Sequence, residues 1–252
     1  MARIQNCRKN DLIVLSRIYI NICMKIDEVI QSLTEGPNDP HIFKAVFMAG
    51  GPGSGKSFVS EKLLSSTGLR TVNSDDIYEY MMGKENLPLD SETIFSPQGQ
   101  EIRNKAKAIT QRKHNSHIDG RLGLVIDGTG KDVARVKRSS EALRELGYEA
   151  MMIFVNTSLE VAQERNQQRQ RSLDPATVEK MWNSVQQNIM SFQQLFGTGN
   201  FIVVDNSGGL EDPNRAENFR RVEKDLYRFL ETPPKMPQAK EWIKSHLPDN
   251  KR

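Results

Sequence analysis

Residues 50–57 carry the clearest chemical signal in this sequence. They read Gly-Gly-Pro-Gly-Ser-Gly-Lys-Ser, which fits the Walker A pattern Gly-x-x-x-x-Gly-Lys-Ser. A loop that wraps a phosphate must aim several backbone N–H groups inward, and glycine allows the conformations that this requires. Lys56 is expected to reach the β- and γ-phosphates of ATP, and the Ser57 hydroxyl to bind Mg²⁺. The predicted nucleotide contacts are Gly50, Gly51, Gly53, Ser54, Gly55, Lys56, Ser57 and Phe58.

Two acids follow the next apolar segment, in Val72-Asn73-Ser74-Asp75-Asp76. If that segment is a strand, they lie at the carboxyl edge of a sheet, where open α/β sheets bind ligands. A carboxylate there can accept the proton of an acceptor hydroxyl. The alternative is that one of the acids caps a helix starting at Ile77. We expect one acid to cap and favour Asp75 for the chemistry.

A third acid, Asp127, ends another apolar segment and precedes Gly128-Thr129-Gly130. Its place is typical of an acid that holds Mg²⁺, directly or through water. The competing interpretation is a helix cap, and the sequence leaves both open.

Two arginines form the last candidate element. Arg165 and Arg169 are four residues apart, so both project from one face of a helix. The planar guanidinium binds phosphate oxygens in a bidentate manner, and the pair is predicted to form a catalytic lid over the transferred phosphoryl group. A solvated basic helix end is the simpler alternative.

The elements that would position these residues are readable. Short apolar runs alternating with helical patterns indicate buried parallel strands joined by crossovers, and hence a three-layer α/β fold around a five-stranded parallel sheet. One helix, with an apolar stripe read as core, is predicted over 176–196. A cap at Asp174 and a proline at 175 would start it. The predicted strands are Lys44–Ala49, Leu69–Asn73, Leu122–Ile126, Ala150–Val155 and Phe201–Val204.

Length and composition indicate one α/β domain with short appendages. The 252 residues divide into an N-terminal helical extension over 1–40, a core over 41–231, and a Pro-rich linker with a short helix over 232–252. The net charge of +3 and the 27% of charged residues are typical of a globular protein. The two cysteines fit a reduced cytoplasm, and no apolar run has the ~18 residues of a membrane span.

One basic segment bears on the acceptor. Residues 103–121 carry six Lys and Arg side chains in a predicted helix and turn, which is either a groove for a phosphate backbone or a solvated helix face.

The motifs together resemble known kinases over roughly residues 44–207. The loop at 50–57, then Asn-x-Asp-Asp at 73–76, Arg-Asn-x-x-Arg at 165–169 and a long helix look like the 5′-kinase domain of phage polynucleotide kinase. The Asp-Gly-Thr turn at 127–129 and the segment Leu143-x-x-x-Gly147-Tyr148 look more like the zeta-toxin group of sugar-nucleotide kinases.

The resemblance implies ATP with Mg²⁺, Asp75 as base, Arg165 and Arg169 as lid, and Asn206 near the adenine. The sequence departs from these kinases in one place. They carry Arg or Lys three residues after the base to hold a substrate phosphate, whereas this chain has Tyr78.

These observations predict a kinase that moves the γ-phosphoryl group of ATP to a hydroxyl acceptor. The acceptor is not identified, and a nucleic acid or nucleotide is one candidate. A sugar-nucleotide kinase like the zeta toxins, and an ATPase switch without an acceptor, are the alternatives.

Overall fold

The computed structural model describes residues 38–246, apart from 72, 169–172 and 209–212. Contacts divide the chain after Asp39, and the unit that begins at Pro40 is described here. Residues 1–37 of the predicted N-terminal helical extension lie outside the described residues. The predicted boundaries at 40 and 231 stay predictions.

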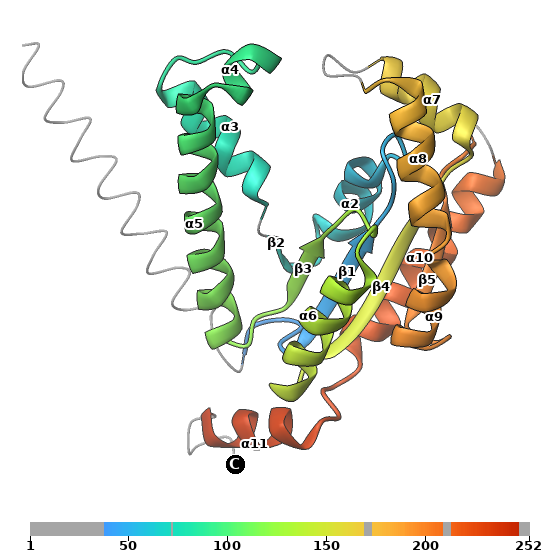
Figure 1. Cartoon of the computed structure of the whole chain (residues 1–252). Helices are drawn as coiled ribbons and strands as arrows, with labels where there is room; N and C mark the ends of the chain where they lie inside the picture. The colour runs from blue at the N-terminus through green and yellow to red at the C-terminus, as the bar shows by residue number, and fades with distance from the viewer. Residues whose placement is uncertain (1–37, 72, 169–172, 209–212, 247–252) are drawn as a thin grey trace, which may run out of the picture. The chain divides into compact units, whose positions relative to one another are not determined.

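Five parallel strands form the sheet, in the order β2-β3-β1-β4-β5. The three-layer α/β P-loop fold predicted from the sequence is therefore confirmed (Figure 1). Strand β2 keeps only the first part of its predicted run, because the chain turns into a helix at Ser74. The strands are β1 (Lys44–Ala49), β2 (Arg70–Thr71), β3 (Leu124–Asp127), β4 (Glu149–Asn156) and β5 (Phe201–Asp205).

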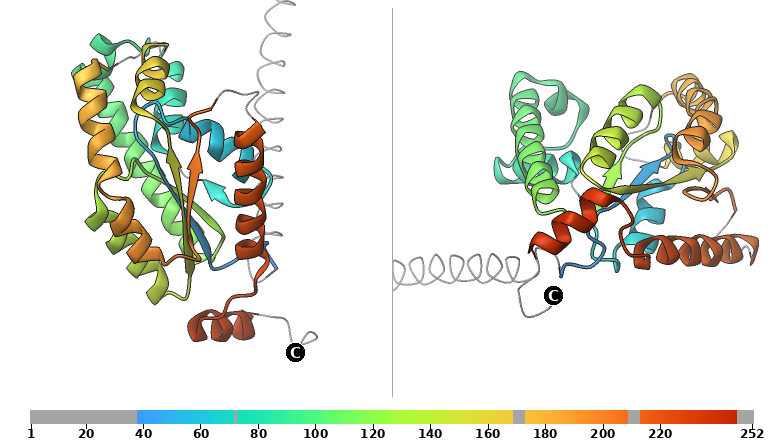
Figure 2. Two further views of the ribbon diagram at one scale, coloured as in Figure 1. Left: turned by 90° about the vertical axis from the view of Figure 1, so that its right-hand side faces the viewer. Right: turned by 90° about the horizontal axis from the view of Figure 1, so that it is seen from below.

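Helices cover both faces of the sheet (Figures 1 and 2). Helices α2 (Lys56–Leu64) and α10 (Pro213–Glu231) pack on one face. Helices α6 (Val133–Glu145), α8 (Pro175–Gln186) and α9 (Ile189–Phe196) pack on the other. α7 (Leu159–Gln167) links β4 to α8, and α11 (Pro237–His246) follows the linker.

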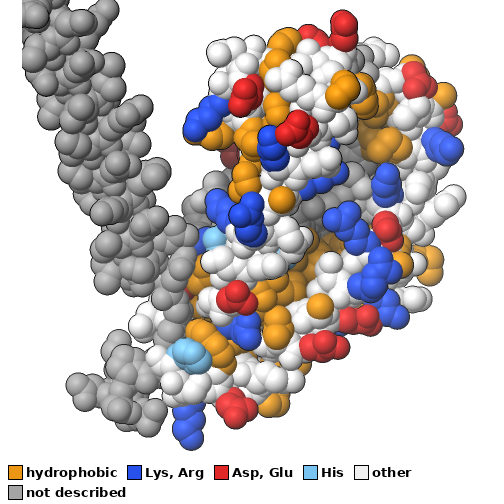
Figure 3. Space-filling view, turned by 60° about the vertical axis from the view of Figure 1, so that its left-hand side comes forward, with side chains coloured by type: hydrophobic (Ala, Val, Ile, Leu, Met, Phe, Trp, Pro, Cys, Tyr) orange, Lys and Arg blue, Asp and Glu red, His pale blue; other side chains and the backbone are white. Residues whose placement is uncertain are grey.

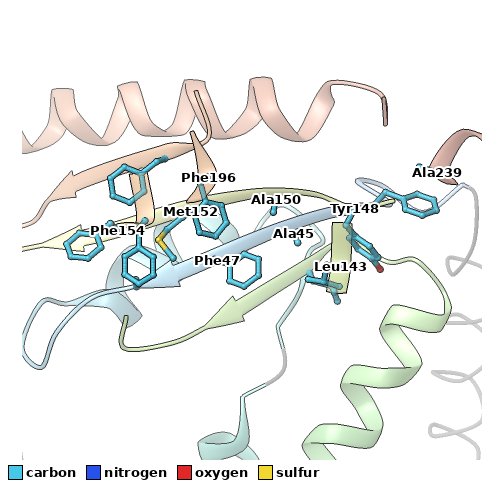
Figure 4. Close-up of a cluster of buried hydrophobic side chains, with 14 of the residues drawn as sticks. Ala45, Phe47, Leu143, Tyr148, Ala150, Met152, Phe154, Phe196 and Ala239 are labelled. Carbon is cyan, nitrogen blue, oxygen red and sulfur yellow. The ribbon is translucent and has the colours of Figure 1, made fainter. Parts of the chain in front are cut away.

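Alternation along the central strands explains the two cores. Ala45 and Phe47 of β1 face the α6, α8 and α9 layer, whereas Val46 and Met48 face α2 and α10. Figure 4 shows the first of these clusters, where Phe47 and Phe196 lie with ring centroids 5.3 Å apart. A strand buried on both faces reads as a continuous apolar run, which is why these strands were visible in the sequence.

A separate helical group stands beside the edge strand. It consists of α3 (Ser74–Lys84), α4 (Ser91–Phe95) and α5 (Pro97–Asp119), with α3 and α5 packed side by side (Figure 1). The group has its own small core of Tyr78, Met82, Ile94, Ile102 and Ala106.

The helix predicted over 176–196 is wrong as a single element. The structure has two helices, and Gln187 and Asn188 lie between them. The predicted start is confirmed, because Asp174 accepts a hydrogen bond from the backbone N–H of Thr177 at 2.9 Å. Among the described helices, none combines the length and apolar character that a membrane crossing requires.

Candidate active site

The loop after β1 is shaped by glycines that no other residue can replace. Gly53 and Gly55 have φ angles of 73° and 77°, in the left-handed region. A Cβ atom on Gly53 would lie 2.2 Å from the carbonyl oxygen of Ala162 in α7. A Cβ on Gly55 would lie 2.3 Å from Nδ2 of Asn206. The loop is thus pressed between α7 and the end of β5.

Lys56, the first residue of α2, pairs with Asp127 at the end of β3. The two side chains meet because β1 and β3 are parallel neighbours, with Met48 in register with Asp127. The helix-cap interpretation of Asp127 is wrong, since Asp132 caps α6 by accepting from the N–H of Arg135 at 2.9 Å. The carboxylate of Asp127 therefore pairs with Lys56 of the phosphate loop and does not cap α6.

Asp75 and Asp76 lie in the first turn of α3, and neither caps it. The extended residue Asn73 caps instead, accepting from the N–H of Asp75 at 2.9 Å, so the helix starts at Ser74 and not at Ile77. Nδ2 of Asn73 also donates to Asp76 at 3.0 Å. The expectation that one acid caps is therefore wrong. The carboxylate of Asp75 is 70% exposed and free to face an acceptor.

Arg165 lies on α7 against the phosphate loop. Its Nη1 atom is buried 3.4 Å from the Cβ position of Gly55 and has no hydrogen-bond partner in the described structure. Burial lowers the pKa of its guanidinium, and the nearby charge of Arg215 adds to this. Arg169 lies outside the described residues, so the predicted lid can be described only in its Arg165 half.

Asn206 follows β5 and closes the loop from the other side. Its Nδ2 donates to the carbonyl oxygen of Ser54 at 2.7 Å, and its own N–H donates to the carbonyl of Asn156 at 2.9 Å. Oδ1 of Asn206 and the hydroxyl of Ser54 are buried without a partner among the described residues. Such groups are costly to leave unbonded, so a ligand that reached them would gain hydrogen bonds.

The residues around the phosphate loop have the chemistry that a bound nucleotide requires. A loop of left-handed glycines, a lysine at a helix N-terminus and an unpaired buried Nη1 are donors arranged for phosphate. Within the described ranges, no group of three or more His, Cys, Asp or Glu side chains gathers as it would for an all-protein metal site. Mg²⁺ bound with phosphates needs only one or two protein oxygens, so the exposed hydroxyl of Ser57 and the carboxylate of Asp127 fit this ion.

The side chain of Phe58 packs against α10. Its ring centroid lies 6.1 Å from that of Phe219 and 4.9 Å from the guanidinium of Arg215, both in α10. Its predicted contact with the nucleotide stays a prediction.

Two residues near the site were not found from the sequence. Asn188, at the break between α8 and α9, donates to the carbonyl oxygens of Gly130 and Lys131 at 2.9 and 3.1 Å. It thereby ties that break to the loop after Asp127. Arg215 neighbours Arg165 from α10. No sequence signal singles out Asn188, because the apolar stripe of 176–196 continues on both sides of it.

The chain is similar to a known protein family. A family model described as an AAA domain matches residues 46–190, more than half of the chain. The chain belongs to this family. The match includes Lys56, Asp75, Asp127 and Arg165, while Asn206 lies beyond it. No curated protein matches the sequence significantly.

Solved structures with low sequence identity are similar to this AAA-domain protein. A chain of the PezAT chromosomal toxin–antitoxin system of Streptococcus pneumoniae matches at a TM-score of 0.52 and 16% identity, covering 83% of this chain and 95% of that one. A gluconokinase from Sinorhizobium meliloti has a TM-score of 0.42 and 17% identity, covering 74% and 97%. A chain of the Pnkp1/Rnl/Hen1 RNA repair complex has 0.46 and 18%, covering 59% and 46%. At these identities the likeness concerns the fold alone.

Proposed function

We propose that this protein is an ATP-dependent kinase that transfers the γ-phosphoryl group of ATP to a hydroxyl acceptor. The observation that carries the proposal is the separation of two carboxylates at one edge of the sheet. Asp127 is paired with Lys56 of the phosphate loop, whereas Asp75, beside the next strand, is exposed and not tied to that loop. One acid is thus placed for the nucleotide and the other for an acceptor.

The proposed reaction assigns a task to each residue. The acceptor oxygen forms a bond to the γ-phosphorus while the bond from that phosphorus to the β–γ bridging oxygen breaks, and ADP leaves with the electron pair. Asp75 takes the hydroxyl proton. Lys56 binds the β- and γ-phosphates, Arg165 and Arg169 neutralise charge on the transferred group, and Asn206 supports the loop near the adenine. Ser57 and Asp127 would hold Mg²⁺, which when bound neutralises phosphate charge.

A polynucleotide or nucleotide-like hydroxyl is our first candidate for the acceptor, and a sugar nucleotide is the second. The use of ATP and a content of only two cysteines favour a cytoplasmic location.

Paired substitutions at neighbouring acids test the assignment. We expect Asp75→Asn to bind ATP normally but to transfer γ-label to a hydroxyl acceptor roughly 10²–10⁴-fold more slowly, the usual effect of losing a positioned base. Asp76→Asn removes the same charge one residue away and should stay within a few-fold of the wild type. Near-normal transfer by Asp75→Asn would remove Asp75 from the role of base.

A further inference from the structure

An arginine from another helix lies beside the proposed base. Arg103 belongs to α5, yet its guanidinium lies 4.4 Å from the ring centroid of Tyr78 in α3, and its Nη1 is 3.8 Å from Oδ1 of Asp75. The Tyr78 ring is 3% exposed and packed in the small core of α3–α5. Arg103 itself is 24% exposed. The arginine is therefore held over a fixed aromatic face.

The guanidinium of Arg103 does not form a close hydrogen bond with the carboxylate of Asp75. A charge-assisted hydrogen bond between guanidinium and carboxylate is about 2.7–2.9 Å long, and the observed separation is 3.8 Å. The carboxylate is mostly exposed, and an exposed pair of this length contributes little to stability. A guanidinium has five N–H donors, and stacking on Tyr78 leaves its edge available to a planar or tetrahedral anion.

A second cation extends the same side of α5. Lys107 follows Arg103 by four residues, so both side chains lie on one face of the helix. Lys107 is exposed and makes no ion pair with any side chain in the described part of the chain, whereas its neighbour Lys105 pairs with Glu101. Figure 3, which brings the α3–α5 side forward, shows several Lys and Arg side chains there. Arg103 and Lys107 thus place two cations on one face of α5, opposite an α3 whose first turns carry Asp75, Asp76 and Glu79.

We propose that Arg103 binds an oxyanion group of the acceptor, a phosphate ester or a carboxylate, and so selects anionic acceptors whose hydroxyl reaches Asp75. The inference rests on the proposed kinase function. It assigns specificity to a residue outside the phosphate loop and the lid, on a helix whose basic residues the sequence left undecided between groove and solvated face.

The test uses acceptor pairs in which both members carry hydroxyl groups and one member also carries an anionic group. The pairs are adenosine with adenosine 3′-phosphate, N-acetylglucosamine with its UDP conjugate, and glucose with gluconate. Label transfer from γ-labelled ATP is measured for the wild type and for Arg103→Gln, Arg103→Lys and Arg112→Gln. Arg112 is the matched control, because it lies about two and a half turns along α5 from Arg103, on the opposite side of the helix.

We expect the wild type to prefer the anionic member of at least one pair. Arg103→Gln should raise the KM for that member roughly 10- to 100-fold, as for loss of a hydrogen bond to a charged group, with kcat nearly unchanged and the neutral member unaffected. Arg103→Lys should recover part of the loss, and Arg112→Gln should match the wild type. The pair that responds distinguishes phosphate from carboxylate.

Two outcomes would overturn the inference, and they differ. Equal transfer to neutral and anionic members, or an equal loss for both in Arg103→Gln, would leave the kinase standing and remove the role of Arg103. Label released only as free phosphate with every acceptor would contradict the kinase function itself.

Discussion

At the scale of single residues, the site contains several buried polar atoms around the phosphate loop that have no hydrogen-bond partner in the described structure. Lys56 is paired with Asp127, so a bound phosphate would share or replace that carboxylate. Nη1 of Arg165 and Oδ1 of Asn206 are buried without partners in the described structure. A nucleotide offers both acceptors and donors to such groups, and this is the physical reason to place it there.

Asn206 gives a prediction at this scale. Asn206→Ala removes the 2.7 Å hydrogen bond to the carbonyl of Ser54 and leaves that buried oxygen unpaired. We expect a loss of about 1–3 kcal/mol in the free energy of unfolding, measured in urea, and weaker ATP binding. Asn218→Ala is the control, because Asn218 makes only long contacts among the described residues: it donates to the carbonyl of Asp205 and accepts from Arg221, each at 3.5 Å. Equal stability of the two variants would mean that Asn206 does not hold the loop.

At the scale of elements, the apolar pattern predicted the five strands, because the sheet is buried on both faces. It did not predict the break in 176–196, because Val185, Ile189 and Phe192 continue the stripe across it. The break depends on a long-range contact, in which Asn188 bonds the loop after β3. The start of α3 was missed for a similar reason, since Asn73 and two acids are all good caps and only the backbone decides among them.

Asn188 gives the prediction for this scale. Asn188→Ala should loosen the loop that follows Asp127, since two carbonyl oxygens lose their donor. We expect kcat to fall several-fold and the free energy of unfolding by about 1–2 kcal/mol. Asn183→Ala, on the exposed side of α8, should change neither quantity. A stability loss with unchanged kcat would show that Asn188 is structural and does not position the loop.

At the scale of the described unit, the fold is stabilised by the two cores of the sheet and by the packing of α11. Gly147 turns the chain between α6 and β4 with a φ angle of 98°, and it lies close against α11. Ala239 of α11 is buried, and Trp242 meets Phe43 edge-on with centroids 5.5 Å apart. The sequence predicted a short helix within 232–252, but its close approach to Gly147 is a tertiary contact that no local pattern encodes.

Gly147 provides a prediction with an internal control. Gly147→Ala places a Cβ 2.8 Å from the backbone nitrogen of Ala239, in addition to the strain of the positive φ. Gly197→Ala carries similar strain, with φ 79°, but its Cβ would have no neighbour within 4 Å. We expect each to lose about 1–3 kcal/mol of unfolding free energy from strain, with Gly147→Ala losing more, as measured by denaturant unfolding. Equal losses would show that α11 accommodates the methyl group.

The most direct test of the central claim is the fate of the γ-phosphoryl group. Purified protein would be incubated with γ-labelled ATP, Mg²⁺ and a panel of 5′-hydroxyl DNA and RNA, nucleosides, nucleoside monophosphates and sugar nucleotides, with Lys56→Ala beside it. We predict covalent label on one class of acceptor that is lost in Lys56→Ala, because the lysine binds the phosphate that moves. Label found only in free phosphate, whichever acceptor is present, would contradict the kinase assignment and indicate an ATPase without an acceptor.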